Sequence, residues 1–165
     1  MYEIGDKIVY GASGVMQVVE LRDMTVADVT RRYYVLREYG TSSTSETLVP
    51  VDNEQLTSQM RPLLSRDEII AVIKEAKSRP DAEWIPDNRA RAEHFKQILS
   101  SGDRGELVAM IRAINLAGER RSEEGKKNFL ADETAMKKAE KLLHSEVSIV
   151  LGIPMEAVPA FIAEL

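Results

Sequence analysis

Residues 65–73, which read SRDEIIAVI, divide the chain into two parts with different patterns. Ser65 and Glu68 have the spacing of a capping box, in which the serine hydroxyl accepts from the backbone amide three residues on and the glutamate reaches back. The isoleucines and the valine that follow supply the apolar stripe of an amphipathic helix. A helix is therefore predicted to begin here, and the change of pattern marks a boundary between two domains.

The part before this boundary has the pattern of short strands. Four runs rich in β-branched and aromatic residues are separated by turn residues: Glu3–Tyr10, Gly14–Leu21, Arg32–Tyr39 and Glu46–Val51. Residues 11–14, reading GASG, predict a turn, and residues 41–45, reading TSSTS, predict a polar hairpin tip. Side chains alternate along the runs, as in strands that bury one face. The pattern predicts a small, strongly bent antiparallel barrel.

The part after the boundary contains further helix signals. Asp103 is predicted to cap the start of one helix, and Gly102 to end the helix before it. A long helix is predicted to begin at residues 122–124, reading SEE, and to stop at Gly152, with a short last helix from Pro154. The apolar stripes of these helices are expected to face one another.

Together these patterns predict an α+β protein with two domains. A small antiparallel barrel is expected over residues 1–55, a linker over 56–64, and an all-α bundle of four to five helices over 65–165. Hydrophobic residues make up 44% of the chain and charged residues 30%, as in folded globular proteins.

The charge and the cysteine count exclude several classes of protein. With 22 Lys and Arg against 27 Asp and Glu, the net charge of −5 excludes a globally basic nucleic-acid-binding protein, so any contact with nucleic acid must be local. The absence of cysteine excludes disulfides, thiolate zinc sites and thiol nucleophiles. Neither a secretory signal nor a membrane-spanning stretch is expected, which favours a cytoplasmic protein.

Motifs that carry catalysis are missing from the sequence. The chain has no nucleophile elbow, no phosphate-binding P-loop and no dinucleotide-binding glycine motif. His94 and His144 each lie on a predicted helix without a histidine partner one turn away, so no metal site is expected. We expect no enzyme and no cofactor. An unrecognised hydrolase is the remaining catalytic alternative, which a cleft rich in buried carboxylates would favour.

Trp84 is the only tryptophan of the chain, and it lies outside any helical stripe. It falls in residues 78–87, reading SRPDAEWIPD, a polar stretch with two prolines. One reading makes the indole a core plug between helices. The other makes it an aromatic wedge beside phosphate-contacting cations, a combination that suits distorted DNA. The cations that this second reading would use are Arg89, Arg91, Lys96, Lys126 and Lys127.

Short motifs occur in a specific order along nearly the whole chain: Ile4–Tyr10 with Gly14 and Val15, Tyr33–Leu36, Leu48–Val51, Arg61–Leu63, Leu99–Asp103, Val108–Arg112, Ala139–Leu143 and Ser145–Val147. Their order and spacing resemble the CarD/CdnL family of bacterial transcription regulators, whose first module is shared with transcription-repair coupling factor. The resemblance implies a Tudor-like barrel that binds the RNA polymerase β subunit. It also implies a helical domain that contacts promoter DNA at the upstream edge of the transcription bubble.

The resemblance further implies that polymerase adds a strand to the barrel edge at Val49-Pro50. The polymerase-binding residues implied are Met24, Thr47, Leu48, Val49 and Pro50. Family members often carry a basic residue or methionine where Leu48 stands, and some carry arginine where Met24 stands, so docking is expected to rest on apolar contact. The alternative is that Leu48 and Val49 pack inside the barrel.

In the second domain, Trp84 resembles the tryptophan that the family places at the bubble edge, and Lys127 falls on a family lysine position. The implied DNA-binding residues are Trp84, Arg89, Arg91, Lys96, Lys126 and Lys127. The sequence departs from the family at residues 85–88, reading IPDN, which put Asp87 between the tryptophan and the arginines.

Binding to free DNA is expected to be weak and to become effective when polymerase holds the chain beside the bubble. A protein-interaction adaptor without DNA contact is the alternative. We expect a monomer, and an exposed barrel edge also leaves a strand-exchanged dimer open.

Overall fold

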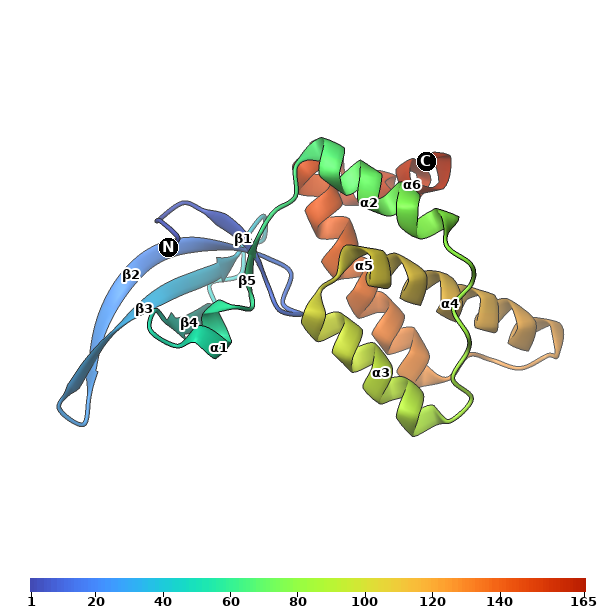
Figure 1. Ribbon diagram of the computed structural model, residues 1–165, viewed down its shortest axis with the longest axis horizontal. Helices are drawn as coiled ribbons and strands as arrows, with labels where there is room; N and C mark the ends of the chain where they lie inside the picture. The colour runs from blue at the N-terminus through green and yellow to red at the C-terminus, as the bar shows by residue number, and fades with distance from the viewer. The chain divides into compact units, whose positions relative to one another are not determined.

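The computed structural model describes residues 1–165 as two compact units, Met1–Leu63 and Leu64–Leu165 (Figure 1). The first unit is an antiparallel sheet of five strands, and the second is helical. The predicted α+β class with a β unit followed by a helical unit is therefore confirmed.

The sheet has the strand order β4-β3-β2-β1-β5. Its strands are β1 (Lys7–Tyr10), β2 (Val15–Val26), β3 (Val29–Glu38), β4 (Glu46–Pro50) and β5 (Met60–Pro62). Strands β4 and β5 are the two edges and do not pair with each other, so the bent sheet is open, an arrangement compatible with the predicted Tudor-like barrel. The turn at residues 11–14 and the loop at 41–45 lie where they were predicted.

One face of the sheet carries the core of the first unit. Tyr34 and Leu36 alternate inward along β3, as the sequence pattern predicts. The buried residues of this core are Ile8, Met16, Val18, Tyr34, Leu36, Val49 and Met60. Tyr2 and Leu56 pack against them, and the Tyr2 hydroxyl donates to the Met60 carbonyl at 3.0 Å.

The stretch predicted as a linker belongs mostly to the first unit. Helix α1 (Glu54–Thr57) follows the cap Asn53, and β5 then pairs with β1 as an edge strand. Met60 is buried in the core opposite Tyr10. The boundary between the two units therefore lies after Leu63, which corrects the predicted linker. The sequence did not indicate β5, because a strand of three residues is too short to show an alternating pattern.

Strands β2 and β3 are longer than predicted and form a hairpin that extends beyond β4 (Figure 1). Their two-residue turn, Ala27-Asp28, has positive φ values of 50° and 62°. Aspartate is among the residues that such turns favour, but alanine is not, so the turn lacks the paired glycine or asparagine signal that would predict it from the sequence.

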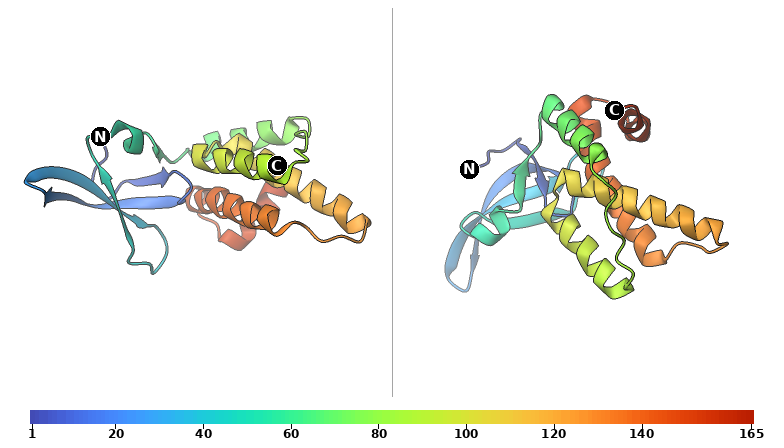
Figure 2. Two further views of the ribbon diagram at one scale, coloured as in Figure 1. Left: turned by 90° about the horizontal axis from the view of Figure 1, so that it is seen from below. Right: turned by 45° about the vertical axis from the view of Figure 1, so that its right-hand side comes forward.

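The second unit consists of α2 (Arg66–Ser78), α3 (Asn88–Ser101), α4 (Arg104–Glu123), α5 (Leu130–Leu151), the 3₁₀ turn η1 (Met155–Ala157) and α6 (Val158–Glu164) (Figure 2). The capping box is confirmed, with reciprocal bonds of 3.2 and 3.0 Å between Ser65 and Glu68. Asp103 caps α4, and Gly102 and Gly152 end α3 and α5 in the left-handed conformation, as predicted.

The predicted helix start at residues 122–124 is wrong. Helix α4 continues to Glu123, and a loop at 125–129 precedes α5. Gly125 has φ +73°, which turns the chain out of α4, and α5 begins after Phe129 without a side-chain cap. Lys126 and Lys127 consequently lie on a loop and not on the first turn of a helix.

Helices α4 and α5 contribute most of the buried core of the second unit, with α2 and α3 packed against them. A buried ion pair joins the first residue of α4 to the last two turns of α5: Arg104 Nη2 lies 2.6 Å from Glu146 Oε2, and the Glu146 side chain is almost completely buried. Glu146 also accepts from the Leu64 backbone amide at 3.3 Å. No single helix of the chain is long and apolar enough to cross a membrane.

His144 on α5 gives a pH-dependent contribution to stability. Burial lowers the pKa of its imidazole below the ordinary value of 6.5, and nearby Glu140 opposes this shift. The unfolded chain therefore binds a proton more readily than the folded chain below about pH 6.5, so stability is lost as the pH falls through this window. We expect the free energy of unfolding to fall more steeply between about pH 7.5 and about pH 5.5 for wild type than for His144→Gln. Equal slopes in urea titrations would contradict this expectation.

Candidate polymerase and nucleic-acid interfaces

Strand β4 has an open edge at the predicted docking strand. Val51 N–H donates to the Arg32 carbonyl at 2.9 Å, so odd-numbered residues of this segment direct their backbone groups toward β3. The backbone N–H and carbonyl of Leu48 therefore point away from the sheet. Pro50 lies at the same outward position, where its missing N–H costs no ladder hydrogen bond.

The side chains predicted to bind polymerase divide between the two faces of the sheet. The register pairs Met24 with Arg31, Tyr33 with Pro50 and Val35 with Leu48, and paired or alternate residues share a face. Met24, Leu48 and Pro50 thus lie together on the face opposite the core. Leu48 is 37% exposed.

The other two predicted residues of β4 lie on the core face. Val49 is completely buried among the core residues, and Thr47 is half-buried. The alternative of packing inside the sheet therefore holds for Val49 and not for Leu48. The side chain of Val49 therefore belongs to the core, which corrects its prediction as a polymerase contact. Neighbouring residues of a strand, such as Leu48 and Val49, point to opposite faces of the sheet.

The face opposite the core is buried at Val35, which pairs with Leu48, and exposed elsewhere, and it carries groups that the sequence did not single out. Val26 and Val29 are exposed at the hairpin tip, on the same face as Met24. At the other end of this face Arg22 lies 2.7 Å from Glu20 and 3.1 Å from Glu46, which also pairs with Arg37 at 2.8 Å. Hydrogen bonds from Arg37 and Arg22 lower the pKa of Glu46 below its ordinary value. The charges at that end neutralise one another, and the apolar residues remain for a partner.

In the second unit, Trp84 lies on the loop between α2 and α3 and is half-buried. Its ring centroid is 6.2 Å from that of Phe95 on α3, and the guanidinium carbon of Arg91 lies 4.6 Å from the indole. Ala109 and Met110 of α4 line the small cavity beside it. The indole is therefore packed on one side against Phe95 and Arg91 and is partly exposed, so it does not fill the core as a fully buried plug would.

Arg91 is not available to a phosphate, which corrects the prediction for this residue. Its side chain is 2% exposed and forms a bidentate pair with Asp132 on α5, at 2.9 and 3.0 Å. It also donates to the Ile85 carbonyl at 3.0 Å and to Asn88 Oδ1 at 2.8 Å. The guanidinium therefore ties the tryptophan loop to the starts of α3 and α5.

The segment in which the sequence departs from the CarD/CdnL pattern is ordered by these bonds. Asp87 caps α3, where its carboxylate accepts from the Ala90 amide at 2.8 Å. Arg91 donates hydrogen bonds to the backbone carbonyls of Ile85 and Pro86. The acidic side chain thus satisfies a helix start, a position that favours negative charge, and does not interrupt the contact between Trp84 and Arg91.

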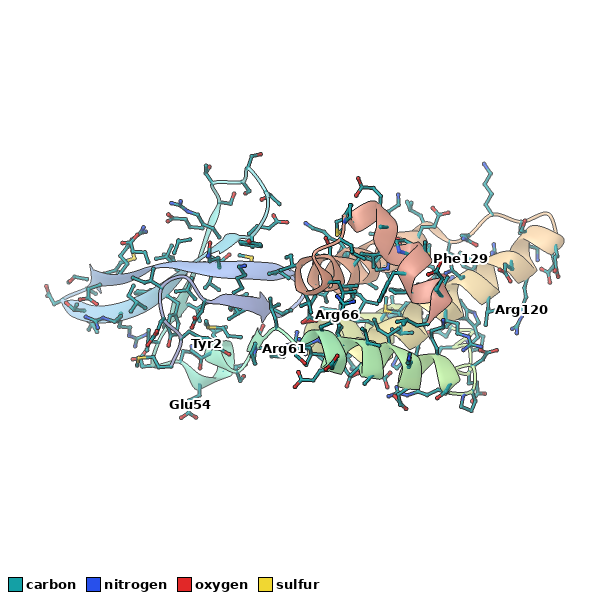
Figure 3. All side chains as sticks on the ribbon, turned by 90° about the horizontal axis from the view of Figure 1, so that it is seen from above. Tyr2, Glu54, Arg61, Arg66, Arg120 and Phe129 are labelled. Carbon is teal, nitrogen blue, oxygen red and sulfur yellow. The ribbon has the colours of Figure 1, made fainter.

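A second aromatic residue links this cluster to the loop before α5. Phe129 lies 5.3 Å from the Arg91 guanidinium and 4.1 Å from that of Arg121. Arg121 Nε donates to the Lys127 carbonyl at 2.8 Å. Trp84, Arg91, Phe129 and Arg121 therefore alternate as aromatic rings and cations, and Lys127 is anchored beside them. Figure 3 labels Phe129 among the side chains of the helical unit.

The remaining predicted cations lie in different places. Arg89 and Lys96 are exposed on the same face of α3, about two turns apart. Lys96 lines a groove between α3 and α5, which Trp84 does not line, and Lys126 pairs with Glu124 at 3.4 Å. The structure thus brings together Trp84, Arg91 and the Lys127 loop, and leaves Lys96 apart from them. No group of three His, Asp or Glu side chains could hold a metal ion.

Comparison with known families gives a match over the first unit. Residues 2–64 match the family model of the CarD-like/TRCF RID domain, an RNA polymerase β-interacting domain. This range ends just before α2, so it covers the sheet unit and not the helical unit. Comparison with curated proteins finds no match.

Proposed function

Because residues 2–64 match the CarD-like/TRCF RID domain, an RNA polymerase β-interacting domain, we propose that this protein is a bacterial transcription regulator that stabilises the open promoter complex. The first unit tethers the chain to the polymerase β subunit. The second unit contacts promoter DNA at the upstream edge of the bubble, without catalysis. A cytoplasmic location is part of this proposal.

The tether uses the open edge of β4. A strand of the polymerase subunit pairs with the outward N–H and carbonyl of Leu48, which extends the sheet by one strand. The side chains of Leu48, Met24 and Pro50 then meet the partner on the exposed face. Since the nearby Arg22, Glu20 and Glu46 already satisfy one another, this contact rests mainly on apolar burial.

The DNA step rests on one observation, the position of Trp84. Its indole is partly exposed, and buried Arg91 supports it through bonds to Asp132 and to the loop itself. A ring held in this way can stack against an unpaired or unstacked base without first ordering its loop. Lys127 and Arg89, both exposed, supply the phosphate contacts.

The tether and the DNA contact work together. A chain with net charge −5 has little general attraction to DNA, so the effective concentration that polymerase provides is what makes the contact useful. If the second unit binds open DNA more tightly than closed DNA, it shifts the equilibrium between closed and open promoter complexes. The size of the shift equals the difference between the two binding free energies, about 1.4 kcal/mol for each factor of ten in affinity.

Trp84 fluorescence tests the DNA contact directly, because the chain has no other tryptophan. We expect titration with forked DNA at low salt to change the emission, and matched closed duplex to change it far less, since only the fork offers unstacked bases. Lys127→Ala is expected to weaken the response while leaving its final amplitude unchanged. An unchanged Trp84 emission at saturating forked DNA would contradict the proposed contact.

The alternative is an adaptor that binds polymerase without touching DNA. The burial of Arg91 favours it, because one predicted phosphate contact is lost. The fluorescence titration separates the two functions, since the adaptor requires no response of Trp84 to forked DNA.

A further inference from the structure

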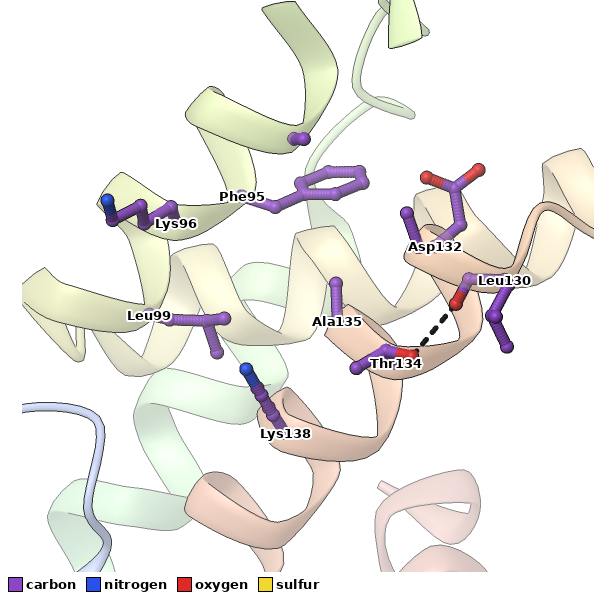
Figure 4. Close-up of a pocket in the computed structure, with 10 residues that line it drawn as sticks. Phe95, Lys96, Leu99, Leu130, Asp132, Thr134, Ala135 and Lys138 are labelled. Carbon is purple, nitrogen blue, oxygen red and sulfur yellow. Dashed lines mark hydrogen bonds between the residues drawn. The ribbon is translucent and has the colours of Figure 1, made fainter. Parts of the chain in front are cut away.

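A groove of about 490 Å³ runs between α3 and α5 (Figure 4). Its floor is apolar: Phe95 and Leu99 point from α3 toward α5, and small residues of both helices lie between them. At one end Leu130 is 77% exposed. The floor residues on each helix extend over about two helical turns. The groove therefore offers an apolar strip that matches a short amphipathic helix in length.

The charges of the groove have one sign. Lys96 on α3 and Lys138 on α5 lie on its two walls, both are exposed, and neither forms an ion pair within the chain. The only carboxylate that lines the groove is Asp132, which is neutralised by its bidentate pair with Arg91. An occupant therefore meets two unneutralised cations above an apolar floor.

We propose that this groove is a docking site for an acidic amphipathic helix of a protein partner. The apolar stripe of that helix covers the floor, where alanines at positions 92, 131 and 135 allow close approach. Its carboxylates pair with Lys96 and Lys138. The groove adjoins the Trp84 cluster through Phe95 and Asp132, but Trp84 itself does not line it. The proposal reassigns Lys96 from DNA to a protein.

Nucleic acid fits the same groove less well. A phosphate backbone pairs with the two lysines but has no apolar group that would cover Leu130, which is the exposed apolar residue of the groove. An acidic helix satisfies both the charges and the floor. DNA binding is retained as an outcome of the test.

Two synthetic peptides and the full chain test the proposal by NMR. One blocked helical peptide carries leucines on one face with flanking glutamates, and its twin carries lysines in place of the glutamates. We expect the acidic peptide to shift the amides of residues 92–99 and 130–138, and to bind about tenfold more tightly than its twin. In Lys96→Glu/Lys138→Glu this preference reverses. Arg66→Glu/Lys74→Glu, with the same change in charge at exposed positions of α2, retains the original preference.

Three results would overturn the proposal. The first is no shift of groove amides by the acidic peptide at millimolar concentration, and the second is equal binding of both peptides, which indicates apolar association alone. The third is loss of forked-DNA binding in Lys96→Glu/Lys138→Glu without any effect on the peptide, which assigns the lysines to DNA. No polymerase or promoter is used, so failure here leaves the proposed open-complex function untouched.

Discussion

Replacing Asp132 with alanine is expected to lower the free energy of unfolding of the helical unit by about 3–5 kcal/mol. The change leaves Arg91, which is 2% exposed, as a buried cation without its counter-ion. The bonds from Arg91 to Ile85 and Asn88 do not neutralise that charge. Urea titration of the full chain, followed by the helical circular dichroism signal, measures the loss.

Two matched variants identify the origin of this loss. Glu75→Ala removes an exposed pair with Arg79 on α2 and is expected to cost less than about 1 kcal/mol. Arg91→Met/Asp132→Leu removes both buried charges and is expected to recover much of the stability that Asp132→Ala loses. A cost for Asp132→Ala no larger than that of Glu75→Ala would show that the buried pair does not hold the loop.

Leu48→Pro is expected to weaken binding to the polymerase β subunit by about tenfold or more. Proline removes the outward N–H of β4, the donor to an added strand, yet the strand tolerates proline where no internal hydrogen bond is lost. Binding of the full chain to immobilised β subunit measures the effect, and thermal unfolding checks that the sheet is intact.

Leu48→Ala is the matched control for this experiment. It shortens the side chain and leaves the N–H in place, so it reports the apolar contact alone and is expected to have the smaller effect. Equal losses in Leu48→Pro and Leu48→Ala, with both variants folded, would show that polymerase recognises the side chain and does not add a strand.

The sequence predicts those parts of the fold whose signals are local. The caps Ser65 and Asp103 and the stop glycines Gly102 and Gly152 depend on residues within one turn, and each is confirmed. Strand β5 and the start of α5 were missed for physical reasons. The first is held by pairing with a distant strand, and the second has no side-chain cap.

The candidate DNA site shows the same division. Trp84 is conspicuous in the sequence because it lies outside any apolar stripe. The burial of Arg91 depends on Asp132, which is 41 residues away in the chain. A local signal for it did exist: Arg91 has the helical spacing of Phe95 and Ile98, which face the core, whereas Arg89 and Lys96 share the opposite face. Position on the helix therefore separates the buried arginine from the exposed cations.

The lifetime of the open promoter complex tests the central claim most directly. It is measured with cognate RNA polymerase alone, with the wild-type protein and with Trp84→Ala, after confirming that both proteins bind the β subunit equally. We predict that wild type lengthens the lifetime and that Trp84→Ala, although bound to polymerase, does not. An equally long lifetime with Trp84→Ala would contradict the assigned role of the indole, and no lengthening by bound wild type would contradict open-complex stabilisation itself.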